Sequence, residues 1–144
     1  MSAYEGKLRL LVCGGRRFGV KLSERELFLD AITPLTARVA LVIHGGAGGA
    51  DVLAAEWADL ECIPCMSFVA PWEHFRAKGK GHVASAGPVR NAWMLEWGEP
   101  DLVLSFPPGK AARQGTLDDS AELLRVDLCE RARAAGVEVR EVRP

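Results

Sequence analysis

The glycine-rich segment from Gly45 to Asp51 is the part of the sequence best suited to binding chemistry. It reads G-G-A-G-G-A-D, follows the apolar run 39–43 and precedes an expected helix. Glycines let a backbone approach a ligand, and a helix N-terminus favours phosphate through its N–H groups and dipole. We expect ligand contacts from Gly45, Gly46, Gly48 and Asp51. The alternative is a tight turn with Asp51 as the helix cap.

The spacing of these glycines excludes two common phosphate-binding motifs. No Gly-Lys-Ser/Thr follows, as a P-loop requires, and Asp51 stands where a dinucleotide fingerprint has its third glycine.

A second glycine pair carries two arginines. Gly14 and Gly15 end the apolar run 8–13, and Arg16 and Arg17 follow directly. An arginine here can pair bidentately with a phosphate, so all four residues are candidate ligand contacts. Solvated surface arginines are the alternative.

A third candidate segment, residues 86–91, is predicted to begin a helix with Pro88 in its first turn. Arg90 is then expected in that turn, where the helix dipole disfavours a cation unless an anion binds beside it. Asn91 could offer donors and acceptors to a base or sugar. An ordinary amphipathic helix is the alternative.

The remaining candidates follow the third and fourth apolar runs. Trp72 could stack on a base, and Lys78, in a basic glycine-containing loop, could close over a phosphate. Trp57, Trp93 and Trp97 have helical spacing and are expected in the core. The other expected ligand contacts are Pro108, Gly109, Gly115 and Thr116.

Alternating apolar strands and amphipathic helices must position these residues. Strands are expected at 8–13, 39–43, 65–69 and 101–106, with an edge strand at 137–142. Helices are expected to start at Ser23, to span 50–60 with Leu53, Trp57 and Leu60 inward, and to span 117–135 before a Gly136 cap. Residues 72–87 are expected to form a loop with at most a short helix. This pattern predicts an α/β fold, a Rossmann-like three-layer sandwich with a mostly parallel sheet of about five strands, which binds ligands at its carboxyl edge.

Composition limits the function further. The chain has 144 residues, typical of a single domain spanning 1–144, and its net charge of -1 makes nucleic acid or an anionic membrane an improbable partner. No run approaches the ~18 apolar residues of a membrane span, and residues 1–11 lack a leader-like pattern, so a cytoplasmic location is expected.

Four cysteines are expected to be reduced thiols. Cys62 and Cys65 have C-x-x-C spacing, for which a structural role and a redox role both stay open, although redox pairs favour a helix N-terminus. No metal site is expected, because the three histidines show no matched spacing.

Taken in order, these motifs resemble the SLOG superfamily, the Rossmann-like domains of the Smf/DprA DNA-processing proteins and the Lonely Guy phosphoribohydrolases. The most similar branch is that of the small YspA-like, or YAcAr, proteins. The resemblance rests on Gly14–Phe18, Gly45–Asp51, Trp72, Lys78-x-x-Gly81, Ala86–Asn91, Phe106–Gly109 and Gly115-Thr116.

The resemblance implies binding or sensing of a nucleotide, ADP-ribose or NAD-related ligand. It assigns no cofactor. It would place Gly14, Arg16, Gly46, Asp51, Arg90 and Asn91 around that ligand. It also implies a homo-oligomer, a dimer or larger.

Two departures from the pattern bear on catalysis. Lys110–Gln114 separates Gly109 from Gly115, and Asp118, Asp119 and Glu122 are out of register with the Lonely Guy catalytic glutamate. Binding is therefore favoured, and no catalytic residue is assigned. The alternatives are a nucleotide N-glycosidic or phosphoribosyl hydrolase, with one of these acids activating water, and a single-stranded DNA-binding module.

Overall fold

A five-stranded parallel sheet forms the centre of the protein. The computed structural model describes residues 6–46, 48–79, 85–108 and 119–143, without the side chains of 119–121. The strands lie in the order β3-β2-β1-β4-β5. Their bounds are β1 Leu8–Gly14, β2 Val39–His44, β3 Cys65–Ser67, β4 Leu102–Phe106 and β5 Glu138–Glu141. The predicted Rossmann-like architecture is confirmed.

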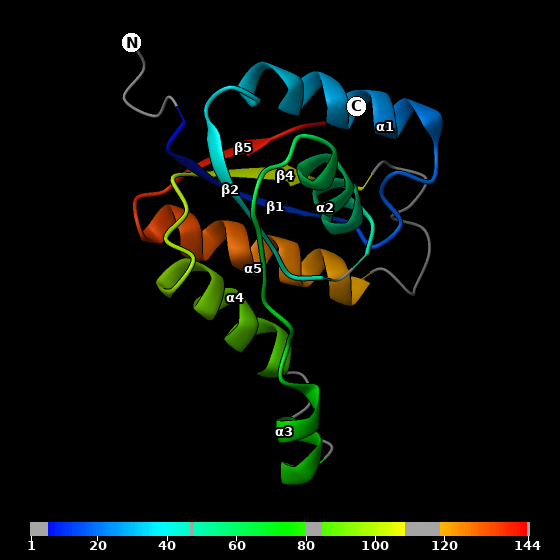
Figure 1. The fold of residues 1–144 in the computed structure, drawn as a ribbon. Helices are drawn as coiled ribbons and strands as arrows, with labels where there is room; N and C mark the ends of the chain where they lie inside the picture. The colour runs from blue at the N-terminus through cyan, green and yellow to red at the C-terminus, as the bar shows by residue number, and fades with distance from the viewer. Residues whose placement is uncertain (1–5, 47, 80–84, 109–118, 144) are drawn as a thin grey trace.

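Helices cover both faces of this sheet (Figure 1). Helices α1 (Leu22–Ile32) and α2 (Ala50–Leu60) pack on one face, and α4 (Ala86–Glu96) and α5 (Asp119–Ala134) pack on the other. The short helix α3 (Trp72–Lys78) projects away from the sheet, within the segment expected to hold at most a short helix. Pro34 stands in a 3-10 turn, Thr33–Leu35, that follows α1 directly.

The central strand β1 serves both layers of the core. Leu10 and Val12 pack with α1 and α2, whereas Leu11 and Cys13 pack with α4 and α5. This alternation follows from the two-residue period of a strand. It brings the Cys13 side chain to the α4/α5 face, one residue before the strand ends.

The inward face of α2 differs from the predicted one. Trp57 is buried as expected, but Leu60 is 82% exposed, and Ala54 and Ala58 occupy the contact with the sheet. Small residues let the helix approach the sheet closely, so the contact face is rotated away from Leu60.

Two further expectations about helices were wrong. Helix α1 begins at Leu22 with Lys21 at the N-cap position, so Ser23 lies inside the helix. Trp97 is 59% exposed, and its ring stacks on that of Trp93 with 5.6 Å between centroids. The expected core role therefore fails for Trp97, because packing on the neighbouring ring replaces burial.

The segment from Gly136 to the end of β5 agrees with the sequence prediction. Gly136 has a φ of +80° and follows α5, and the Val137 N–H donates to the Ala132 carbonyl across it. This is a glycine C-cap. It turns the chain into β5, the predicted edge strand.

Candidate functional site

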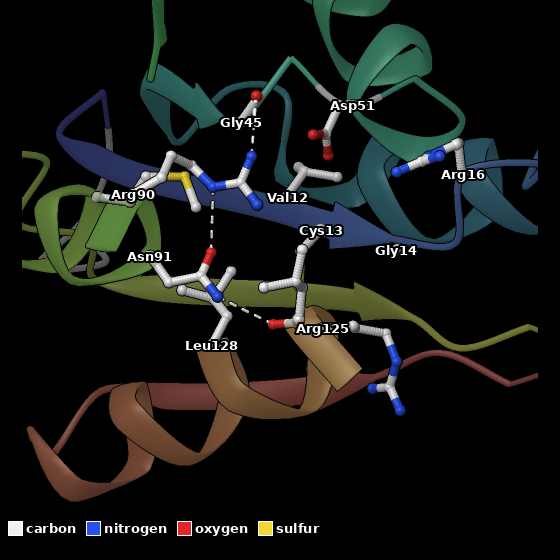
Figure 2. A pocket seen from close by; sticks show the side chains of 12 residues that line it. Val12, Cys13, Gly14, Arg16, Gly45, Asp51, Arg90, Asn91, Arg125 and Leu128 are labelled. Carbon is white, nitrogen blue, oxygen red and sulfur yellow. Dashed lines mark hydrogen bonds between the residues drawn. The ribbon is translucent and has the colours of Figure 1, made fainter. Parts of the chain in front are cut away.

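A pocket lies at the carboxyl edge of the sheet, on the side of α4 and α5 (Figure 2). The chain order reverses beside β1, whose neighbours are β2 and β4. In open parallel sheets such a switch point is the usual ligand site. Six of the predicted contact residues line the pocket: Gly14, Arg16, Gly45, Asp51, Arg90 and Asn91. Segments far apart in the sequence therefore converge here.

Arg90 is the buried cation of this pocket. Its side chain reaches from α4 to the end of β2, where Nη1 donates to the Gly45 carbonyl at 3.1 Å, and Nε donates to Asn91 Oδ1 at 3.2 Å (Figure 2). Both acceptors are neutral, and within the described ranges the guanidinium forms no ion pair. Burial lowers the pKa of Arg90, and the charge of Asp51 opposes this shift.

The position of Arg90 in α4 differs from the predicted one. The helix begins at Ala86, so Arg90 is its fifth residue and lies beyond the first turn. The dipole argument for an anion is weaker than predicted. The burial of a guanidinium that forms no ion pair with any described residue is the stronger argument for an anion, because a charge removed from water needs a partner.

Asn91 positions this guanidinium. The residue is 1% exposed, and its Nδ2 donates at 3.0 Å to both the Leu124 carbonyl and Asp127 Oδ2 on α5. Its Oδ1 accepts from Arg90. The Asn91 amide thus links α4 to α5 and holds the Arg90 guanidinium, and these hydrogen bonds take the place of the expected ones to a base or sugar.

Two glycines leave space at the edge of β1 and β2. A Cβ on Gly14 would lie 2.7 Å from the Ala50 Cβ and 2.9 Å from the Phe106 carbonyl oxygen. A Cβ on Gly45 would lie 2.5 Å from Arg90 Nη1. Both distances are too short for real contacts, so a Cβ does not fit at either position. The absence of a Cβ at Gly14 lets α2 approach β1, and its absence at Gly45 lets Arg90 reach the backbone.

Asp51 and Arg16 add charges of opposite sign. Asp51 is buried in the first turn of α2, where Gly49, not Asp51, occupies the N-cap position. A carboxylate in a first turn is favoured by the helix dipole. Arg16 is exposed, and its side chain extends toward Asp51 in Figure 2.

His44 ends β2 next to this loop. Its Nδ1 accepts the Gly46 N–H at 3.0 Å, which leaves the ring neutral with its proton on Nε2. Burial lowers the pKa of His44, while the charge of Asp51 acts in the opposite direction.

Arg125 is a pocket residue that sequence reasoning missed. It is buried on α5 and forms ion pairs with Glu122 at 2.6 Å and with Glu141 at 2.9 Å. These carboxylates raise its pKa, with the Glu122 hydrogen bond as the largest cause. Nothing in a helical pattern distinguishes a buried arginine from a surface one. The other missed lining residues are Val12, Cys13, Met94, Leu124 and Leu128.

Other predicted contacts stand outside the pocket lining. Trp72 and Lys78 are exposed on α3, and Arg17 and Gly46 are also exposed. Gly15 is buried and donates its N–H to the Phe106 carbonyl; Pro108 lies beside it, and Gly48 lies beside Arg16. The positions of Gly109, Gly115, Thr116, Asp118 and the segment 110–114 lie outside the described residues.

Comparison with known proteins identifies the family of this chain. A family model described as the YspA, cpYpsA-related SLOG family matches residues 8–75. The Gene 61 protein of Mycobacterium phage D29 is 33% identical over 106 residues, which cover 72% of this chain and 79% of that protein. The chain belongs to the YspA, cpYpsA-related SLOG family. No solved structure gave a significant match.

Membership of this SLOG family points to a function related to nucleotide ligands. The matched range includes Gly14, Arg16, Gly45 and Asp51, whereas Arg90 and Asn91 follow it. Among the described residues, no group of three or more potential ligands could hold a metal ion. Within the same ranges, no helix has both the length and the apolar character to cross a membrane.

Proposed function

We propose that this SLOG protein binds or senses a nucleotide-derived phosphate ligand, with a phosphate group against Arg90. The observation that supports this most is the buried Arg90 guanidinium, which has only neutral hydrogen-bond partners among the described residues and lines the pocket. A phosphate oxygen would supply the counter-charge that burial demands.

The balance of charges around the pocket favours an anion. Arg125 pairs with Glu122 and Glu141, and Arg143 also pairs with Glu141, so two cations match two carboxylates there. The other charged residues that line the pocket are the cations Arg16 and Arg90 and the carboxylate Asp51. Two cations facing one carboxylate attract a phosphate and disfavour a cationic ligand.

Pocket size indicates which part of a ligand enters. The cavity measures about 40 Å³. One water needs roughly 10–15 Å³ of such space, so the cavity suits a phosphate-sized group and excludes a whole nucleotide. The sugar and base would lie outside it, toward the exposed Arg16 and Gly46. ADP-ribose and NAD-related ligands fit this mode because their phosphates lie between two larger groups.

Hydrolysis of an N-glycosidic bond has less support. The Glu122 carboxylate receives two N–H groups of Arg125, which removes it as a ready base. The side chains of the other two acids considered, Asp118 and Asp119, lie outside the described ones.

Isothermal titration of the full chain with AMP, ADP-ribose, NAD and a cyclic nucleotide tests this function. We expect saturable binding of at least one ligand, and a loss of affinity of tenfold or more in Arg90→Ala, on the order of the energy of one charged hydrogen bond. Arg140→Ala, which removes an exposed arginine of β5, should bind as the unmodified protein does. Binding that survives unchanged in Arg90→Ala would contradict the assigned role, and no binding of any ligand would contradict the function.

Self-association and a cytoplasmic location remain expectations. Sedimentation velocity over a range of protein concentrations measures the first, with a dimer or larger species as the expected result.

A further inference from the structure

Two buried cysteines meet beneath the pocket. Cys13 lies on β1 and Cys129 on α5, and they are 7% and 1% exposed. Both belong to the apolar cluster between the sheet and the α4/α5 layer. Their side chains are close enough for a hydrogen bond between them to be the largest cause of the pKa shift of each thiol. Two cysteine side chains from distant parts of the chain are therefore neighbours.

A buried serine completes this pair. Ser105 on β4 is the register partner of Cys13, is fully buried, and hydrogen-bonds to both thiols. Its Oγ accepts the Arg125 Nη1–H at 2.8 Å. Because that hydrogen bond uses the acceptor side of the hydroxyl, the single hydroxyl proton of Ser105 is available for donation to one of the two sulfur atoms. This arrangement stabilises a thiolate better than a neutral thiol.

The electrostatic environment agrees with this geometry. The hydrogen bond from Cys13 and then that from Ser105 lower the pKa of Cys129 to about 6, against burial, and the charges of Arg125 and Arg133 add to the effect. The shared hydrogen bond raises the pKa of Cys13. The pair therefore loses one proton readily and retains the second.

The pocket gives small molecules access to this pair. Cys13 lines it, whereas Cys129 is buried in the core and does not line it. We propose that Cys13 and Cys129 form a site of reversible oxidation, at which a peroxide converts the two neighbouring thiols into a disulfide between β1 and α5. This inference concerns the floor of the pocket and does not depend on the identity of the proposed ligand.

The chemistry balances with hydrogen peroxide as the oxidant. One thiolate attacks a peroxide oxygen, the O–O bond breaks, and the departing hydroxide takes a proton to become water, which leaves a sulfenic acid. The second sulfur attacks the sulfenic sulfur, the S–S bond forms, and the hydroxyl group leaves as a second water with the remaining thiol proton. In sum, two thiols and one peroxide give one disulfide and two waters.

The exposed C-x-x-C pair is the less suited of the two. Cys62 and Cys65 lie after the C-terminal end of α2, and burial raises the pKa of Cys65. Thiolate formation is thus disfavoured at one of these residues, and no helix N-terminus assists it.

The test uses the full chain with Cys62→Ser and Cys65→Ser, which leaves Cys13 and Cys129 as its only cysteines. After hydrogen peroxide treatment, mass spectrometry should show the loss of two hydrogen atoms and a peptide pair linked through these residues, both reversed by dithiothreitol. Detection of unlinked Cys13 and Cys129 peptides alone, whether as thiols or as over-oxidised acids, would overturn the proposal.

A second variant tests the role of the serine. In the same background, Ser105→Ala should slow disulfide formation by tenfold or more near neutral pH and shift the rise of the rate to higher pH, because sulfur loses its hydrogen-bond donor. Far-ultraviolet circular dichroism establishes that this variant is folded. An unchanged rate and pH profile in the folded variant would show that Ser105 only packs, and would overturn that role.

Discussion

The Gly45 carbonyl and the Arg90 guanidinium are in direct contact, and a Cβ at Gly45 would lie 2.5 Å from Arg90 Nη1. The glycine at the end of β2 is thus matched to an arginine on α4. The contact couples the glycine-rich loop to the buried cation, and it can be tested by substitution at either residue.

Gly45→Ala should displace the Arg90 side chain. Overpacking of this kind costs about 1–3 kcal/mol of unfolding free energy, measured by urea denaturation. The same change in an Arg90→Ala background should cost less, because the clashing atoms are gone. Equal costs in the two backgrounds would show that the strain arises elsewhere.

Arg125 should contribute more to stability than an exposed arginine of the same helix. Arg125→Met leaves Glu122 and the buried Ser105 without this partner, while Glu141 keeps its pair with Arg143. We expect a loss of about 2–4 kcal/mol of unfolding free energy, below the full range for buried pairs because Glu122 and Glu141 are partly exposed. Arg131→Ala, which breaks an exposed pair with Asp127, should cost at most about 1 kcal/mol. Urea denaturation of both variants provides the comparison, and similar losses would contradict the buried network.

His44 should make the protein less stable in mild acid. Burial lowers the folded-state pKa of His44 below its ordinary value of 6.5. Between that lowered pKa and about 6.5, the unfolded chain binds more protons, so stability falls as the pH decreases through this window.

The variant His44→Asn keeps an acceptor for the Gly46 N–H and removes the titration. Its unfolding free energy should depend less on pH below about 6.5, which follows from the linkage relation. His74→Asn, at an exposed position, is the control and should retain the original slope. An unaltered slope in His44→Asn would assign the acid sensitivity to other groups.

Trp57 and Trp97 should differ sharply in their contribution to stability, although both have apolar helical spacing. Trp57 lies on α2, and Trp97 is the C-cap residue of α4. Trp57→Ala removes a side chain that is 6% exposed and should cost about 3–5 kcal/mol. Trp97→Ala loses one stacked ring contact at the surface and should cost about 1 kcal/mol or less. Thermal denaturation of the two variants checks this difference, and a reversed order would contradict the burial pattern.

Much of this fold could be predicted because strand and helix signals agree with each other. The run Leu8–Cys13 and the glycines after it give a buried strand and a turn without any tertiary information. The rotation of a helix is harder to predict, since Leu60 has the spacing of a core residue but Ala54 and Ala58 fit closer to the sheet. Small residues at a contact look neutral in a hydropathy pattern.

The residues of the candidate site also fall into those that could be predicted from the sequence and those that could not. Glycine loops and arginines after strands are visible as local signals, and so is the start of the helix that carries Arg90 and Asn91. Six residues predicted from these signals line the pocket. Arg125, Ser105 and the thiol pair carry no local signal, because they depend on β4, β5 and α5 meeting. Cysteine spacing gives no hint of this pair for a related reason, since Cys13 and Cys129 are distant in sequence and neighbours in space.

The order of the strands also determines which parts of the chain must be in place for the pocket to exist. Strands β1, β2 and β3 come from one continuous stretch, and α2 packs on them within that stretch. Arg90, Asn91 and Arg125 arrive only with the later segments that add β4 and β5 on the other side of β1. A binding-competent pocket therefore requires both halves of the chain to be docked. Ligand affinity would then report on the completeness of the fold, and a ligand would select the fully assembled molecule over any partly folded form.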